Sequence, residues 1–180
     1  METFERKNYR GFEIEINYDD CPDNPRKEWD NVATFACNHS RYDLGDKVDF
    51  DDELDRLFAK YVNTSSIIDY FVKEYNAAPS VDEDGDKIYE WKAKRCDGLT
   101  VMRSIAASSD DELCELISDD YLDSMDKINL INESDDVVIR TISIYEHGGI
   151  TVWLGTPDGH VDARWDCGIV GIAFVEKSKA

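Results

Sequence analysis

The segment Val137-Val-Ile-Arg-Thr-Ile-Ser-Ile-Tyr-Glu146, with His147-Gly-Gly149 and Ile150-Thr-Val-Trp-Leu154 after it, decides the fold. Two apolar, β-branched runs separated by glycines predict a β-hairpin with strands over about 136–146 and 150–154. A further apolar run, Ile169–Val175, predicts the last strand, and we expect Glu176–Lys179 to be a frayed tail. The C-terminal third is therefore predicted to be sheet.

The N-terminal part offers strands that could complete this sheet. From Tyr9 to Tyr18, Phe12, Ile14 and Ile16 alternate with polar residues, which predicts a strand with one buried face. The proline-rich stretch 20–27 predicts a loop, and the apolar run Val32–Cys37 predicts a second strand.

The middle of the chain has helical periodicity. Apolar residues at three- and four-residue steps predict one long amphipathic helix from about Asp51 to Tyr75, which Asn63–Ser66 could kink or divide. Residues 89–94 and 99–105 fit strand or helix equally well. A shorter acidic helix is predicted over Asp110–Tyr121, with Ser108 or Ser109 as its N-cap.

These elements predict the α+β class: an antiparallel sheet from N- and C-terminal strands, one long amphipathic helix and a shorter acidic helix. A chain of 180 residues fits a single domain over 1–180. Residues 78–130 are its variable segment and a candidate insertion.

The charge of the chain limits its partners. Forty acids and twenty bases give a net charge of 20 − 40 = −20. Nucleic acid and anionic membranes would repel such a chain, whereas a basic protein would attract it. No apolar leader or membrane-spanning run is present, and the five cysteines are irregularly spaced. These features predict a cytoplasmic protein with reduced thiols.

Motifs for cofactors, metals and catalysis are weak. No phosphate-binding glycine loop occurs, and Asp82-Glu-Asp-Gly-Asp86 lacks the ligand spacing of a calcium loop. His39, His147 and His160 lack zinc-site spacing relative to the cysteines. Cys37 and His39 could share a strand face, but no cysteine-hydrolase signature surrounds them. We therefore predict no catalytic residue, metal or cofactor.

Acidic residues form the clearest pattern. Between 110 and 126 there are eight acids and no base. If the whole stretch is helical, five of them form one stripe about 21 Å long, which could imitate successive phosphates of a nucleic-acid strand. A second acidic block covers 43–55. The predicted partner-binding residues are Asp110, Asp111, Glu112, Glu115, Asp119, Asp120, Asp123, Asp126, Asp49, Asp51, Asp52 and Glu53.

Two groups of motifs carry a family resemblance. The first is Glu28-Trp-Asp-Asn31 with His39-Ser-Arg-Tyr-Asp-Leu-Gly-Asp46, and the second is Tyr145-Glu-His-Gly-Gly149 with Trp165-Asp-Cys-Gly-Ile-Val-Gly171. Together they resemble a family of uncharacterised bacteriophage and prophage proteins, except that Gly148 and Cys167 stand where the family often has serine. The resemblance covers about the first 50 and the last 45 residues and carries over no catalytic residue.

The resemblance implies a mobile-element protein in the cytoplasm of a bacterial host. Small acidic phage proteins are often inhibitors of host defence, including anti-CRISPR and anti-restriction proteins that imitate DNA. The leading hypothesis is a non-enzymatic DNA mimic that binds a basic, nucleic-acid-handling host nuclease. One alternative is an enzyme that uses a cluster of His39, His147 and Asp166. Another is a phage protein whose acidity only keeps it soluble.

Overall fold

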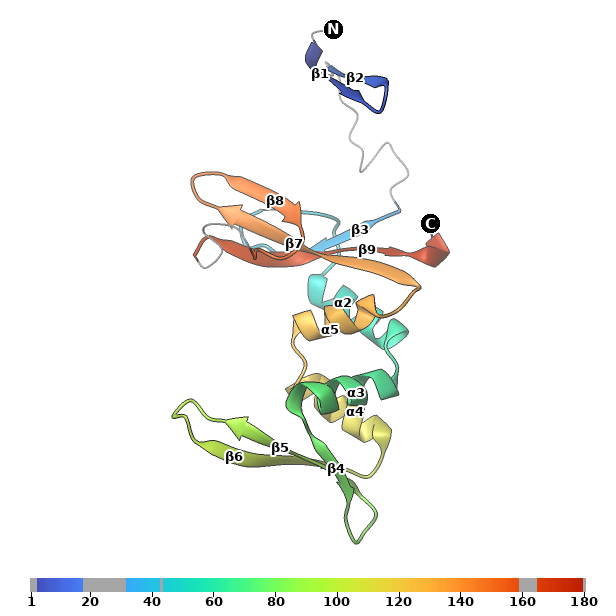
Figure 1. Ribbon diagram of the computed structural model, residues 1–180, viewed down its shortest axis with the longest axis vertical. Coiled ribbons are helices and arrows are strands. Elements are labelled where there is room, and N and C mark those ends of the chain that lie inside the picture. Colours follow the sequence, from blue (N-terminus) through green and yellow to red (C-terminus); the bar gives the residue numbers. More distant parts are fainter. Residues whose placement is uncertain (1–2, 18–31, 43, 159–164, 180) are drawn as a thin grey trace. The chain divides into compact units, whose positions relative to one another are not determined.

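The computed structural model describes residues 3–17, 32–42, 44–158 and 165–179 (Figure 1). The chain divides into two compact units, residues 1–32 and 33–180. The predicted loop over 20–27 and the motif residues Trp29, Asp30, Asp43 and His160 lie outside the described residues.

The first unit contains a two-stranded antiparallel hairpin, β1 (Thr3–Tyr9) and β2 (Phe12–Asn17). Arg10 and Gly11 form its turn, both with positive φ (51° and 86°), as two-residue hairpin turns require. The prediction of a single strand with Phe12 and Ile14 buried is wrong, because these side chains are 75% and 45% exposed. A two-stranded ribbon has no second layer to cover either face.

The second unit begins with a four-stranded antiparallel sheet. Its strands are β3 (Thr34–Cys37), β7 (Val137–Glu146), β8 (Ile150–Leu154) and β9 (Cys167–Glu176), in the order β3-β9-β7-β8. The predicted C-terminal hairpin and final strand are present. The N-terminal strand that joins them is β3 rather than the segment 9–18, which pairs in its own hairpin.

A three-stranded antiparallel sheet forms from the part of the sequence that fitted strand and helix equally. Its strands are β4 (Ala78–Val81), β5 (Lys87–Lys94) and β6 (Thr100–Ala107), in the order β4-β5-β6. Tyr89 and Trp91 on β5 and Ile105 on β6 are buried, which gives this sheet one covered face.

Four helices accompany the two sheets: α2 (Phe50–Tyr61), α3 (Thr64–Tyr75), α4 (Asp110–Asp120) and α5 (Ser124–Asn132). The predicted long helix is two helices, divided after Tyr61 at the Asn63–Ser66 segment where the sequence allowed a kink or division. Asn63 is extended there (φ −95°, ψ 161°), and its side chain accepts a hydrogen bond from the Ser66 N–H as an N-cap. A short 3₁₀ turn, Lys177–Lys179, ends the described chain.

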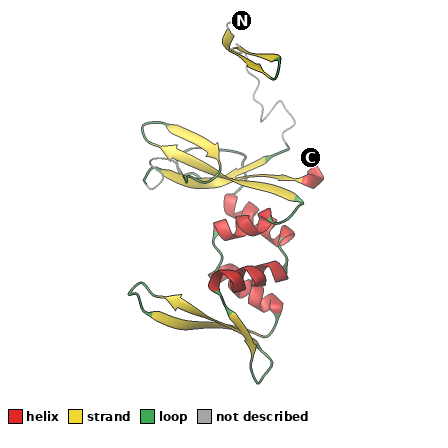
Figure 2. Cartoon of the chain, viewed as in Figure 1, coloured by secondary structure: helices red, strands yellow, loops and turns green. Residues whose placement is uncertain are grey.

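Each helix pair packs on its own sheet. Helices α2 and α5 contact each other and the β3-β9-β7-β8 sheet, whereas α3 and α4 contact each other and the β5–β6 strands (Figure 2). The buried apolar residues of both halves form one continuous cluster.

Aromatic rings connect α3 to the smaller sheet. The centroid of the Phe71 ring lies 4.9 Å from that of Tyr75, 5.2 Å from that of Trp91 and 5.3 Å from that of Tyr121. The pairs with Trp91 and Tyr121 are edge-to-face. Phe71 is fully buried. Edge-to-face pairs add to the stabilisation from area burial, so this cluster holds α3, β5 and the end of α4 together.

We expect Phe71→Ala to lower the free energy of unfolding by about 3–5 kcal/mol, because it leaves a cavity among four rings. Urea denaturation of the purified protein measures the loss. Met102→Ala, at a largely exposed position on β6, serves as the control and should change stability by less than about 0.5 kcal/mol. Similar losses in both variants would contradict the central role of the ring cluster.

A buried carboxylate joins α2 to the end of β9. Glu176 is 3% exposed, and its Oε1 accepts hydrogen bonds from Lys60 (2.9 Å), Arg56 (3.1 Å) and Tyr61 (3.0 Å). The Lys60 hydrogen bond, and after it those from Arg56, Lys179 and Tyr61, hold the pKa of Glu176 far below its usual range against the opposing effect of burial. The predicted frayed tail is thus wrong at Glu176, which is anchored.

We expect Glu176→Gln to cost about 1.5–3 kcal/mol at neutral pH, the range for hydrogen bonds to a charged group. Because the folded-state pKa is depressed, the stabilisation is complete above the unfolded-state value of about 4.3 and is lost as the pH falls below it. Denaturant unfolding at several pH values should therefore show that the difference in free energy of unfolding between variant and parent becomes smaller in acid. Glu83→Gln, in the exposed β4–β5 turn, is the matched control, and a pH-independent gap would contradict the assignment.

Candidate functional site

Helix α4 presents a row of carboxylates to solvent. Leu113, Cys114 and Ile117 are buried on one side of the helix. At 100° per residue, the exposed acids at 111, 112, 115 and 119 fall on the opposite side. We call these four residues the α4 acidic face: Asp111, Glu112, Glu115 and Asp119.

The C-terminal part of this face opposes the electrostatics of its own helix, whereas Asp111 and Glu112 lie in the first turn, where acids are favourable. Asp119 and Asp120 lie in the last turn, which contains no base, although the C-terminal end of a helix favours cations. Like charges four residues apart, such as Glu115 and Asp119, also destabilise a helix by about 0.2–0.5 kcal/mol per pair. The helix is thus less stable than an equivalent one with mixed charges.

Glu112 keeps its charge while it caps the helix. Its Oε2 accepts hydrogen bonds from the Ser108 hydroxyl (2.6 Å) and the Ser108 N–H (2.9 Å). The hydroxyl contact, and after it the backbone contact, lower the pKa of Glu112. The carboxylate is therefore ionised at neutral pH. Ser109 is the N-cap, as the sequence predicted.

The predicted continuous stripe over 110–126 is wrong beyond residue 120. Helix α4 ends at Asp120, Leu122 is buried, and Asp123 starts α5 as its N-cap. Asp126 completes the capping box and accepts a hydrogen bond from the Tyr70 hydroxyl, which raises the pKa of Tyr70. Asp110 pairs with Lys87 at 2.5 Å. Asp110, Asp123 and Asp126 therefore have structural partners, and the row shortens to about 12 Å.

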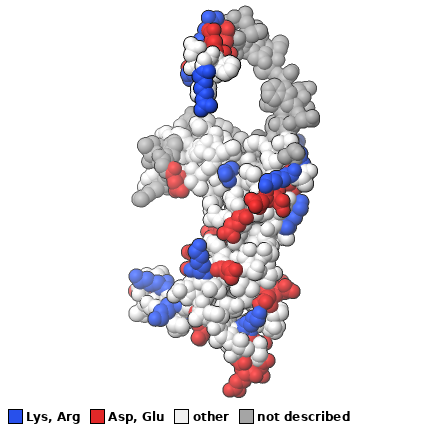
Figure 3. All heavy atoms as spheres, turned by 45° about the vertical axis from the view of Figure 1, so that its right-hand side comes forward, with Lys and Arg blue, Asp and Glu red and all other residues white. Residues whose placement is uncertain are grey.

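The second acidic block is largely structural as well. The Asp49 side chain caps α2, and hydrogen bonds from the Asp52 N–H, and after it from Asn38, lower its pKa. Glu53 pairs with Arg56 at 2.8 Å, and Asp55 pairs with Lys127 at 2.8 Å. Asp51 and Asp52 remain exposed in the first turn of α2. On the face drawn in Figure 3, acidic and basic side chains lie side by side in several places.

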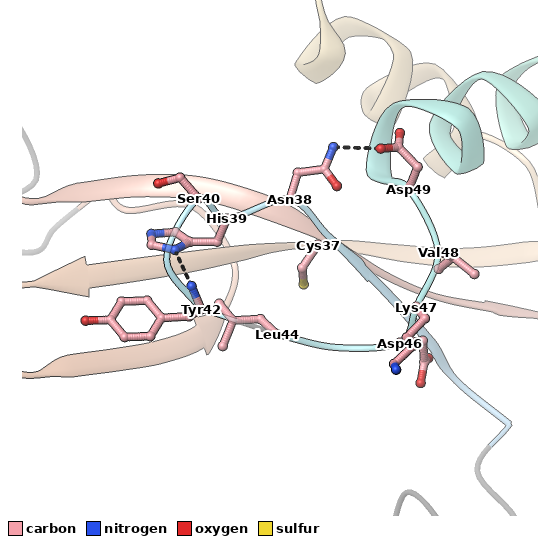
Figure 4. A pocket seen from close by; sticks show the side chains of 10 residues that line it. All are labelled: Cys37, Asn38, His39, Ser40, Tyr42, Leu44, Asp46, Lys47, Val48 and Asp49. Carbon is pink, nitrogen blue, oxygen red and sulfur yellow. Dashed lines mark hydrogen bonds between the residues drawn. The ribbon is translucent and has the colours of Figure 1, made fainter.

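A second candidate site is the loop that follows β3. It lines an open, shallow pocket of about 790 Å³ (Figure 4). Asn38 and Asp49 close the loop with a 3.1 Å hydrogen bond between their side chains. The lining residues are Cys37, Asn38, His39, Ser40, Tyr42, Leu44, Asp46, Lys47, Val48 and Asp49.

Two glycines of the quoted motifs allow the loop to pack against the sheet. Gly45 has φ +75°, and a Cβ there would lie 2.5 Å from the Phe35 carbonyl oxygen. A Cβ at Gly171 would lie 2.1 Å from the Ala36 carbonyl oxygen. Asp46 exchanges hydrogen bonds with the Phe35 backbone at the edge of β3. These motif residues therefore have a packing role.

His39 fixes the start of this loop. Its Nδ1 accepts hydrogen bonds from the N–H groups of Arg41 and Tyr42, both at 3.2 Å. The proton of the neutral ring is therefore on Nε2, 3.7 Å from Glu146 Oε2. Glu146 also accepts from Arg41 (2.6 Å) and from the Tyr42 hydroxyl (3.3 Å). Sequence analysis did not single out Glu146, although it lies inside the Tyr145–Gly149 motif.

This arrangement does not assemble a cysteine–histidine pair. His39 Nδ1 is occupied by backbone donors, and Cys37 is the last residue of β3, so His39 lies beyond the strand. Burial, and after it the Asp46 carboxylate, raise the pKa of the Cys37 thiol. A protonated thiol is a poor nucleophile.

The other members of the proposed cluster form a separate contact. His147 Nδ1 lies 3.3 Å from Asp166 Oδ2, and the His147 side chain is mostly exposed. The carboxylate could orient the imidazole, as in general-base sites. His39 instead contacts Glu146. His39, His147 and Asp166 therefore belong to two separate contacts and not to one cluster.

Neither a metal centre nor a membrane-spanning helix is found among the described residues. No group of three or more His, Cys, Asp or Glu side chains there is arranged to hold a metal ion. None of the helices there is long and apolar enough to cross a membrane.

Comparisons with protein-family models, with curated proteins and with solved structures found no match for this chain.

The role of His39 can be tested by hydrogen exchange. We expect His39→Ala to speed amide exchange at Arg41 and Tyr42 about fivefold or more, because each loses an acceptor worth about 1 kcal/mol or more. Exchange at Leu113 in α4 should not change and serves as an internal control. Unchanged protection at both loop amides would contradict this role.

Proposed function

We propose that this protein binds a basic surface of another protein through the α4 acidic face and thereby inhibits a nucleic-acid-handling nuclease of a bacterial host. The observation that carries this proposal is the charge of α4: all its acids except Asp110 are exposed, the helix contains no base, and the acids in its last turn destabilise it. Sequences that accept such a local cost often do so at functional sites.

The charge of the whole chain supports the same kind of partner. At −20, the protein is attracted by cationic surfaces before contact. Grooves that hold nucleic acid are cationic, and a carboxylate row can replace bound phosphates there. The phage-type motifs add the setting, because inhibitors of host nucleases are frequent among small acidic phage proteins. The proposal is therefore binding without catalysis.

The shorter row of carboxylates on α4 can imitate fewer phosphates of a nucleic-acid strand. About 12 Å of helix corresponds to only a few successive phosphates, at about 3.4 Å each. Asp120 and the exposed pair Asp51 and Asp52 are the further acids of the original set that stay available. The contact proposed here is accordingly a local one, centred on Asp111, Glu115 and Asp119.

The test compares two variants of equal charge. Asp111→Asn/Glu115→Gln/Asp119→Asn neutralises the α4 acidic face, and Glu83→Gln/Asp84→Asn/Asp135→Asn neutralises three other exposed acids. Both bring the net charge from −20 to −20 + 3 = −17. Each is added to DNA-cleavage assays with a panel of restriction and RNA-guided nucleases.

We expect the parent to inhibit at least one nuclease, with inhibition that weakens steeply in salt. The α4 variant should lose about tenfold to a hundredfold in inhibition, at roughly 0.5–1 kcal/mol per charge. The control variant should stay within about twofold. Equal losses would show that net charge alone matters, and an absence of inhibition across the panel would contradict the proposal.

A further inference from the structure

The first residues of the loop after β3 are held by an uncharged imidazole ring. His39 Nδ1 accepts hydrogen bonds from the N–H groups of Arg41 and Tyr42, both at 3.2 Å. A neutral histidine has one ring nitrogen with a proton and one with a lone pair, whereas the charged ring has protons on both. The contacts with Arg41 and Tyr42 therefore require the neutral form of His39, with its lone pair on Nδ1.

A further proton has one place to bind on this ring. Nε2 carries the proton of the neutral form, so a second proton goes to Nδ1. It takes up the lone pair that both amides use, and the ring then presents a donor to two N–H donors. Donors do not pair with one another, so the two amides have to leave the ring and find another acceptor, such as water.

The charged groups around His39 do not replace the lost acceptor. Glu146 on β7 lies 3.7 Å from Nε2, and the side chains of Arg41 and Tyr42 already donate to it. The Tyr42 ring stacks on the imidazole, with 5.0 Å between the centroids. The other titratable side chains that line the same pocket are Cys37, Asp46, Lys47 and Asp49 (Figure 4). Glu146 can keep the charged ring beside β7, but it lies at the wrong ring nitrogen to hold the loop amides.

We propose that protonation of His39 releases the start of the loop, so that the pocket wall formed by Ser40 and Tyr42 is ordered at neutral pH and opens in acid. Only the neutral ring binds the two amides. The contacts are therefore complete above the pH range in which imidazole titrates, about pH 6.5 in model peptides, and are lost as the pH falls through that range. This inference uses no residue of the α4 acidic face and does not depend on the proposed function.

The other end of the loop stays in place over the same pH range. Asp46 exchanges hydrogen bonds with the Phe35 backbone. Asp49 accepts a hydrogen bond from Asn38 and caps α2. Hydrogen bonds from the Asp52 N–H, and after it from Asn38, lower the pKa of Asp49, so this carboxylate stays ionised in mild acid. The change is therefore confined to the start of the loop.

The test follows backbone amide exchange of the full chain by NMR from about pH 7.5 to about pH 5, on both sides of the imidazole range. Exchange is expressed as a protection factor, because the intrinsic exchange rate changes with pH. We expect the protection factors of Arg41 and Tyr42 to fall about fivefold or more on acidification. Those of Asp52, whose N–H is capped by Asp49, and of Leu113 in α4 should stay within about twofold.

His39→Asn is the matched variant. An asparagine Oδ1 accepts hydrogen bonds from N–H groups a few residues further on, as His39 Nδ1 does, but it does not titrate. We expect the protection factors of Arg41 and Tyr42 in this variant to be independent of pH within about twofold.

The nitrogen NMR signals of the His39 ring give a second readout that does not depend on the variant. In the parent they should show the Nε2–H tautomer at neutral pH and titrate together with the loss of amide protection. Protection that is independent of pH in the parent, or that falls equally in His39→Asn, would overturn the proposal. A ring that becomes protonated while both amides stay protected would overturn it too.

Discussion

The fold of the second unit depends on β9 pairing with two strands at once. One edge of β9 binds β3, where Thr34 lies opposite Phe174, and the other binds β7, where Ile139 lies opposite the same residue. Strand β9 thereby joins strands from both ends of the unit through backbone pairing alone, without the helices. Glu176 at the end of β9 then fixes α2 through Lys60 and Arg56. Residues Ile172 and Phe174, which face the helices, are buried as a result.

The acids of this chain divide into two groups with different tasks. Asp49, Asp123 and Asp126 cap helices, and Glu176 is buried with three cationic partners. Such carboxylates stabilise local structure and are satisfied by it. Among the exposed acids of α4, Glu112 also caps the helix through Ser108, whereas Glu115 and Asp119 add like-charge repulsion toward its C-terminal end. The net charge counts both groups of acids equally, so it does not show which acids are available at the surface.

Sequence periodicity predicted the parts of the fold that local patterns determine. The hairpin of β7 and β8, the strand β9 and the Ser109-capped helix have strong alternation, turn or capping signals, and all are present. The departures from prediction have two causes. Phe12 and Ile14 alternate like a core-facing strand but are exposed, which depends on tertiary context. The division of the helix at Asn63 is local, because the Asn63 side chain caps the next helix.

The candidate sites, too, were predictable only where a local sequence pattern determines them. The acids of α4 were predictable, because helical spacing places them opposite Leu113 and Ile117. The end of α4 at Asp120 also agrees with the helix predicted over Asp110–Tyr121. The roles of Asp123 and Asp126 were not predicted, because their use in the capping box of α5 depends on a second helix that starts after the buried Leu122. Sequence also could not place Glu146 beside His39, since that contact needs β3 and β7 to flank the same strand.

The contact between α2 and α5 has a consequence for how this chain can vary. Helix α2 ends at Tyr61 and α5 begins at Ser124, and the two helices pack together on the larger sheet. The intervening residues, with α3, β4, β5, β6 and α4, are connected to this helix pair by two separate crossings, one after Tyr61 and one before Ser124, on opposite sides of the pair (Figure 1). A segment whose two ends are held apart can be exchanged between relatives only if the replacement keeps that separation. The carboxylates of the α4 acidic face are exposed, so they can change by substitution without altering either crossing.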